Sequence, residues 1–143
     1  MKLTRRSETL LITLLIVLLT ISGFAQMPIF KRYYIADLPG LGWLARFYVT
    51  HLIHYLAAAA LIGYAAYAAM KRWMIKESGT ASAVVRIKWT ALAVLIVTGA
   101  LMVIKNLPGT PFSHGVIIGL DLIHLLSCMV LIGSMIAGAF VRQ

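Results

Sequence analysis

Charged residues are scarce in this sequence, and acidic residues are the scarcest of all. Only 12% of the 143 residues are charged, with 4 Asp or Glu against 13 Lys or Arg, while 62% are hydrophobic. Soluble domains have a charged share of about 25%. The composition therefore excludes an ordinary soluble enzyme domain and predicts a membrane protein.

Cysteine is almost absent as well. Cys128 is the only cysteine, so the chain has no internal disulfide and no Cys-x-x-Cys-His motif for attaching a c-type haem. Iron–sulfur clusters need several thiolates, which excludes a cluster held by this chain alone. We expect Cys128 to be a small apolar residue within a helix.

Long hydrophobic runs fill most of the chain. A run of about 18 or more apolar residues is long enough to cross the bilayer as a helix. Such runs cover about residues 8–25, 45–70, 89–105 and 114–140. We predict an all-α membrane protein, a single four-transmembrane-helix bundle over residues 1–143. Residues 23–25 resemble a signal-peptidase site, but we expect the first run to be an uncleaved helix. We expect no internal repeat.

Lysine and arginine are unevenly distributed between the two sides of the predicted bundle. The two ends of the chain and the 71–88 loop carry nine of them, whereas the other side carries four. By the positive-inside rule, both termini are predicted to be cytoplasmic. We expect the membrane to be a bacterial or archaeal inner membrane. This rule and anionic lipid headgroups explain the net charge of +9, so we expect no nucleic-acid partner.

The predicted outer loop, residues 26–44, is unusually apolar for a loop. It contains Pro28 and Pro39 together with several aromatic and aliphatic side chains. Such a segment is typical of one that lies along the membrane surface. A docking surface for a partner is the alternative.

Ionisable residues inside the spans are few, and they gather on two helices. His51 and His54 lie on the second predicted helix, whereas His114, Asp121 and His124 lie on the fourth. An ionisable group within a membrane is costly, which makes each a candidate functional residue.

Two of these histidines lie at matched depth. The second and fourth helices run in the same direction, and His54 and His124 each lie about ten residues, or about 15 Å, below the outer start of the helix. Two inward imidazoles suit axial ligation of a haem b iron. His51, one turn shallower, is the alternative ligand to His54. Arg46 and Lys105, with Arg32, are candidates to bind the propionates.

Asp121 is the only carboxylate deep within a span. A carboxyl group buried in a membrane stays protonated unless it is paired. Asp121 could exchange protons with a quinone near the outer rim, with His114 or His51 completing the relay. Alternatively, its side chain orients a ligand imidazole through a hydrogen bond.

The segment 46–55, Arg-Phe-Tyr-Val-Thr-His-Leu-Ile-His-Tyr, followed by a helix of small residues and by the later His124, resembles the four-helix cytochrome b subunits of respiratory oxidoreductases. Examples are the membrane subunits of formate dehydrogenases and nickel–iron hydrogenases. The resemblance implies electron transfer between the quinone pool and a peripheral partner on the outer face, either an iron–sulfur protein or a c-type cytochrome. It also implies that His54 and His124 bind the outer haem.

This sequence departs from the pattern of that family. The first helix has no histidine, Gly138 stands where a second histidine of the last helix is expected, and the spacing from His114 to His124 is short. We therefore expect one haem rather than two. Two other classes remain open. One is a cofactor-free membrane anchor in which the histidines join helices, and the other is a small proton or cation transporter.

Overall fold

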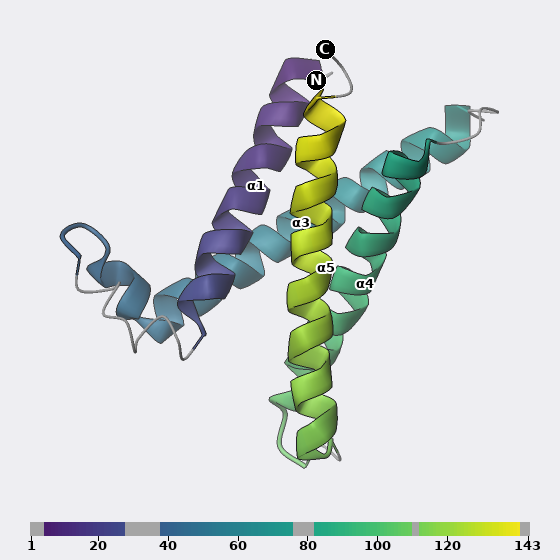
Figure 1. Cartoon of the computed structure of the whole chain (residues 1–143). Coiled ribbons are helices and arrows are strands. Elements are labelled where there is room, and N and C mark those ends of the chain that lie inside the picture. Colours follow the sequence, from purple (N-terminus) through teal and green to yellow (C-terminus); the bar gives the residue numbers. More distant parts are fainter. Residues whose placement is uncertain (1–4, 28–37, 76–81, 110–111, 141–143) are drawn as a thin grey trace. The chain divides into compact units, whose positions relative to one another are not determined.

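A computed structural model describes residues 5–27, 38–75, 82–109 and 112–140. Within these ranges all regular structure is helical (Figure 1). The elements are α1 (Arg5–Ala25), the short 3-10 helix η2 (Gly42–Ala45), α3 (Phe47–Ile75), α4 (Ala83–Lys105) and α5 (His114–Phe140). Four of them, α1, α3, α4 and α5, are long and apolar enough to span a membrane. The all-α class and the four candidate spans are thus confirmed.

Two helix ends differ by five or more residues from the sequence prediction. α3 continues to Ile75, five residues beyond the predicted end, and α4 begins at Ala83, six residues before the predicted start. Long basic side chains such as Arg72 let a helix continue out of the apolar core, because their charged ends reach water. The start of α4 is capped by Ser82, whose hydroxyl oxygen accepts the backbone N–H of Val85 at 3.4 Å. The prediction counted only apolar residues and therefore missed these polar helix ends.

The chain divides into two compact units, residues 1–77 and 78–143, and each is a hairpin of two long helices. In the first unit α1 and α3 run antiparallel. Glu8, near the start of α1, pairs with Lys71 near the end of α3, the carboxylate oxygen and Nζ being 3.8 Å apart. Near the other end of α1, Ser22 contacts His54 in the first half of α3.

The outer loop enters this first hairpin through its last residues. The chain turns at Gly40, whose φ of 84° favours glycine, and η2 then buries Leu44. Most of the predicted membrane-surface segment, together with Arg32, lies outside the described residues. Its position along the membrane therefore remains a prediction.

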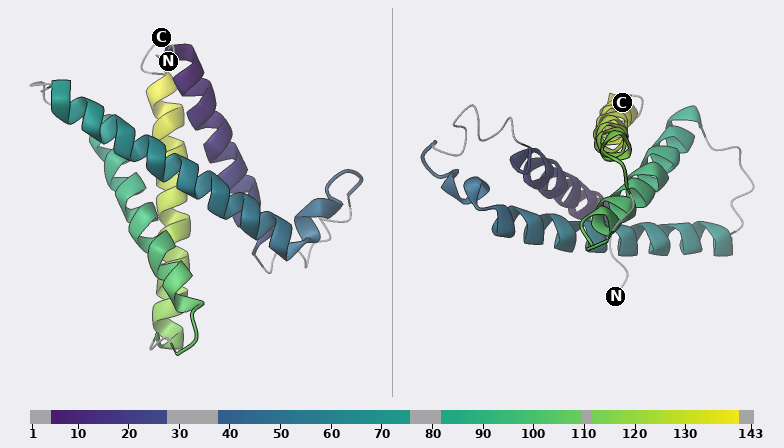
Figure 2. Two further views of the ribbon diagram at one scale, coloured as in Figure 1. Left: turned by 180° about the vertical axis from the view of Figure 1, so that it is seen from behind. Right: turned by 90° about the horizontal axis from the view of Figure 1, so that it is seen from below.

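The second unit is the hairpin of α4 and α5, which lie side by side (Figures 1 and 2). Lys105 ends α4 and contacts Asp121 in the first half of α5. At the other end, Gly138 of α5 lies against Lys88 of α4. Between the two helices the chain turns at Gly109, which has a φ of 80°.

The two hairpins share sequence motifs, so the expectation of no internal repeat is wrong. Leu-Ile-His-x-Leu, followed four residues later by Leu-Ile-Gly, occurs at 52–63 in α3 and again at 122–133 in α5. On the preceding helices, Leu-x-x-Ser-Gly at 19–23 in α1 corresponds to Leu-x-x-Thr-Gly at 95–99 in α4. Leucine and isoleucine are common in every span. The repeat therefore stands out only when helices with the same place in each hairpin are compared.

The repeat extends to packing. Leu61 in α3 and Leu131 in α5, which occupy the same position of the motif, are both buried, at 9% and 8% exposure. The same holds for the hydroxyl residues Ser22 and Thr98 on the preceding helices, at 0% and 5%. Each hairpin therefore closes around equivalent positions.

Candidate functional site

In the first hairpin, a histidine of α3 is held by a hydroxyl group of α1. His54 Nδ1 lies 3.0 Å from the Ser22 hydroxyl oxygen, which itself lies 2.6 Å from the backbone carbonyl oxygen of Leu18. Two oxygens approach this closely only with a hydrogen between them, and the hydroxyl is the only group there that carries one. Ser22 therefore donates to Leu18, and its oxygen faces Nδ1 of His54 as an acceptor. The role of Nδ1 in this contact depends on the tautomer of the ring.

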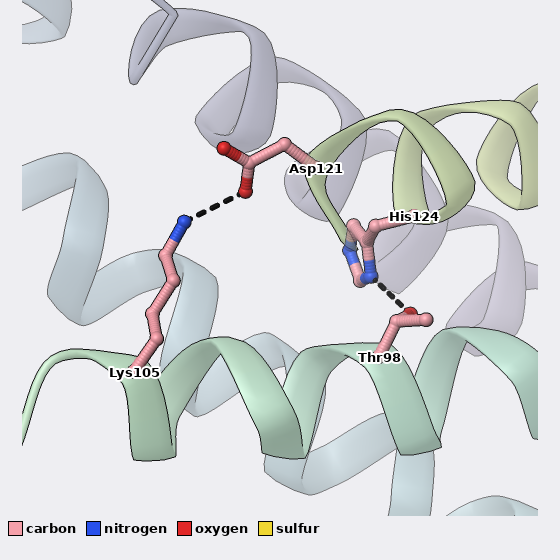
Figure 3. Close-up of polar contacts among 4 residues, drawn as sticks. All are labelled: Thr98, Lys105, Asp121 and His124. Atoms are coloured by element: carbon pink, nitrogen blue, oxygen red, sulfur yellow. Dashed lines mark hydrogen bonds and ion pairs between the residues drawn. The ribbon is translucent and has the colours of Figure 1, made fainter. Parts of the chain in front are cut away.

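The second hairpin contains the same arrangement (Figure 3). His124 Nδ1 lies 2.8 Å from the Thr98 hydroxyl oxygen, and that oxygen lies 2.7 Å from the backbone carbonyl of Val94. Thr98 thus donates to Val94, and its oxygen faces Nδ1 of His124 as an acceptor. In a neutral ring with the proton on Nδ1, the lone pair is on Nε2, a nitrogen that a metal can use.

A glycine lies beside each of these rings. A Cβ placed on Gly23 would be 3.3 Å from Cε1 of His54, and one placed on Gly99 would be 3.5 Å from Cε1 of His124. Each glycine directly follows the hydroxyl residue in the sequence. The serine–glycine or threonine–glycine pair therefore supplies both the hydrogen-bond acceptor and the space for the ring.

His51 has different surroundings from His54. Its Nδ1 donates to the side-chain oxygen of Gln26 at 3.1 Å, and the Gln26 amide nitrogen donates to the backbone carbonyl of Ser22, also at 3.1 Å. The His51 ring lies between Phe47 and Tyr55, with ring centroids 5.0 and 4.2 Å away. His51 therefore joins α3 to the end of α1 near the His54–Ser22 contact.

Asp121 forms an ion pair with Lys105, the last residue of α4 (Figure 3). The Lys105 ammonium nitrogen lies 2.7 Å from a carboxylate oxygen of Asp121, and the two side chains are 16% and 49% exposed. The group that contacts Nδ1 of His124 is Thr98. One role considered for Asp121 was a hydrogen bond that orients a ligand imidazole. At the His124 ring, the hydrogen bond to Nδ1 is made by Thr98.

The remaining predicted residues lie at helix starts. His114 is the first residue of α5, Arg46 directly precedes α3, and both are exposed. Because α3 begins at Phe47, His54 lies about 10 Å along its helix, against about 15 Å for His124. The predicted matched depth therefore rested on a helix start that lies two residues too early.

No three or more His, Cys, Asp or Glu side chains come together to hold a metal ion in the described parts of the chain. Each of the two histidines, taken by itself, could supply at most one ring nitrogen to a metal. A metal bound by such a residue needs its other ligands from elsewhere, as haem iron has four from the porphyrin.

Sequence reasoning missed Ser22 and Thr98, although a hydroxyl residue followed by glycine on the first helix of each hairpin was a readable signal.

The chain matches no protein-family model, no curated protein and no solved structure.

Proposed function

We propose that this chain is a b-type cytochrome subunit of a membrane-bound respiratory oxidoreductase, in which His54 and His124 ligate one haem. The observation that supports the proposal is the repeated half-site. Each hairpin offers one histidine, at the same position of the same motif, with Nδ1 against a hydroxyl oxygen of the preceding helix. Bis-histidine ligation requires a neutral ring nitrogen on each face of the haem.

The repeat also favours His54 over His51 as the ligand. His54 corresponds to His124 in the Leu-Ile-His motif, whereas the position of His51 is occupied by Asp121 in the second copy. The glycine beside each ring is present in both copies as well. Equivalent half-sites suit a ligand whose two faces are alike.

In this proposal the haem supplies one-electron transfer, and the chain positions it and handles protons. Arg46 and Lys105 are the cations for the propionates. Asp121, paired with Lys105, exchanges protons with a quinone, and His114 or His51 relays them. The partner is an iron–sulfur protein or a c-type cytochrome on the outer face of a bacterial or archaeal inner membrane.

The proposal is tested by visible spectra of histidine variants purified in detergent. We expect a reduced-minus-oxidised b-type spectrum with about one haem per chain by pyridine haemochrome analysis. His54→Ala and His124→Ala remove an iron ligand and should abolish haem binding without preventing membrane insertion. The matched controls His51→Ala and His114→Ala should retain it.

Two results would contradict this assignment. Full haem content in His124→Ala would remove that histidine from the ligand set, and loss of haem only in His51→Ala would replace His54. A chain that is colourless both alone and within its complex would overturn the cytochrome proposal.

A cofactor-free membrane anchor is the second candidate, and the same contacts support it. A histidine bonded to a hydroxyl group on the neighbouring helix is a common way of joining helices in lipid. The anchor predicts no visible absorbance in any complex. It also predicts that the histidine variants change helix packing alone.

A further inference from the structure

The hydroxyl groups of Ser22 and Thr98 determine which nitrogen of each neighbouring histidine carries the proton. We propose that Ser22 and Thr98 are positioning residues that hold His54 and His124 in the Nδ1–H tautomer, in which Nε2 carries the ring lone pair. We call this fixed tautomer the tautomer lock. Its role in metal binding rests on the proposed haem function, but the lock itself does not.

The argument starts from the hydrogen count. Each hydroxyl has a single hydrogen, and in both residues it lies toward a backbone carbonyl four residues earlier, at oxygen–oxygen distances of 2.6 Å for Ser22 and 2.7 Å for Thr98. The hydroxyl can then only accept from a third group. The Nε2–H tautomer would bring the Nδ1 lone pair within 3.0 Å of an oxygen lone pair, and no hydrogen would lie between them.

Both hydroxyl groups are fixed by the helices that carry them. The carbonyls that accept their hydrogens belong to Leu18 and Val94, one turn earlier in α1 and α4, so each acceptor is part of a regular helix. Ser22 is fully buried and Thr98 is 5% exposed. Water therefore cannot readily replace either hydroxyl as the partner of the ring.

The lock matters because free histidine prefers the proton on Nε2, the nitrogen that would have to bind iron. A partner for Nδ1–H fixes the tautomer and the ring orientation of a metal-binding histidine and makes it more basic. Here the ring N–H donates to the hydroxyl oxygen, and the hydroxyl donates to a helix carbonyl. Two hydrogen bonds in series polarise each other, so the carbonyl strengthens the bond to the ring. Loss of such a partner typically lowers metal affinity about 10- to 100-fold.

The experiment measures the tautomer directly, on the full chain without haem. The chain is produced with 15N-labelled histidine in haem-deficient cells and reconstituted in phosphatidylcholine nanodiscs, and the ring nitrogens are observed by NMR at alkaline pH. We expect Nδ1–H at both His54 and His124 in the wild type. Wild-type rings with the proton on Nε2 would overturn the proposal.

Variants separate the lock from ordinary packing. Thr98→Val keeps the shape but removes the hydroxyl, so His124 should change to the Nε2–H tautomer while His54 stays unchanged as the internal control. Thr98→Ser restores the hydroxyl and should restore Nδ1–H. Ser22→Ala should shift only His54, and Ser22→Thr should not. An unchanged His124 tautomer in Thr98→Val would contradict the assignment.

Haem binding is measured in the same samples by titration with haemin. We expect about 10- to 100-fold weaker binding for Thr98→Val and Ser22→Ala, and near-normal binding for Thr98→Ser. Locked tautomers in a chain that binds no haem would overturn the cytochrome proposal and leave the lock standing. Haem binding with Nε2–H rings in the haem-free chain would overturn only the lock.

Discussion

At the scale of single residues, the two half-sites differ in the space beside the ring. A Cβ on Gly23 would lie 3.3 Å from Cε1 of His54, closer than ordinary van der Waals contact, whereas the corresponding distance at Gly99 is 3.5 Å. A methyl group at the first site requires the ring to move by a few tenths of an ångström. The second site accepts a methyl group without such a shift.

We therefore predict that Gly23→Ala and Gly99→Ala have different effects. Gly23→Ala should destabilise the first hairpin by about 1–3 kcal/mol, the usual cost of overpacking, and should lengthen the His54–Ser22 hydrogen bond. Gly99→Ala should leave stability unchanged or slightly increased. Thermal unfolding in detergent gives the comparison, and equal destabilisation by both substitutions would contradict it.

The sequence revealed some of the site residues and hid others for a physical reason. His54, His124, Asp121 and Lys105 stand out because an ionisable side chain is rare in an apolar run. Ser22 and Thr98 are hidden, because a hydroxyl within a span usually bonds to its own helix. The repeated hydroxyl–glycine pair marks them in the sequence, but the histidine that each contacts is known only once the neighbouring helix and its rotation are known.

At the scale of helices, each hairpin has a second polar contact one turn before its candidate ligand. In the first hairpin this contact is the neutral pair of His51 and Gln26, at 3.1 Å, and in the second it is the ion pair of Asp121 and Lys105, at 2.7 Å. Both contacts join the second helix of the hairpin to the end of the first. His51 and Asp121 occupy equivalent positions of the repeat, but the two contacts differ in charge.

This difference predicts different salt responses in double-mutant cycles. The cycle of Asp121→Asn and Lys105→Gln should give a coupling of up to about 1 kcal/mol, because the Asp121 side chain is half exposed, and the coupling should fall as salt screens the charges. The cycle of His51→Phe and Gln26→Leu is the neutral control. Its coupling, measured by the same thermal unfolding at alkaline pH, should not depend on salt. A salt-independent Asp121–Lys105 coupling would contradict the role of charge.

Helix positions could be predicted from the sequence better than helix ends. All four long helices were predicted from apolar length alone, since about 18 such residues cross a bilayer. The early start of α4 could not be predicted from apolar length. It depends on the cap at Ser82 and on basic side chains that extend toward water. The repeat was missed, because its motifs are built from residues that are common in every span.

At the scale of the whole molecule, the prediction that can be tested first is topology. If all four helices span the membrane, the excess of lysine and arginine at both ends and in the 71–88 loop places these parts in the cytoplasm. A green fluorescent protein fused after Gln143 should fluoresce, and alkaline phosphatase fused there should be inactive. Phosphatase fused after Pro108 should be active. An active phosphatase at Gln143 would reverse the predicted orientation.

The recurring motifs make each hairpin an internal reference for the other. Position 22 has serine where position 98 has threonine, and His51 stands where the second hairpin has Asp121, yet the histidine, the glycine beside it and the flanking leucines are the same in both. A synthetic chain with the second hairpin in both places would therefore test whether these differences matter to the fold and to the site.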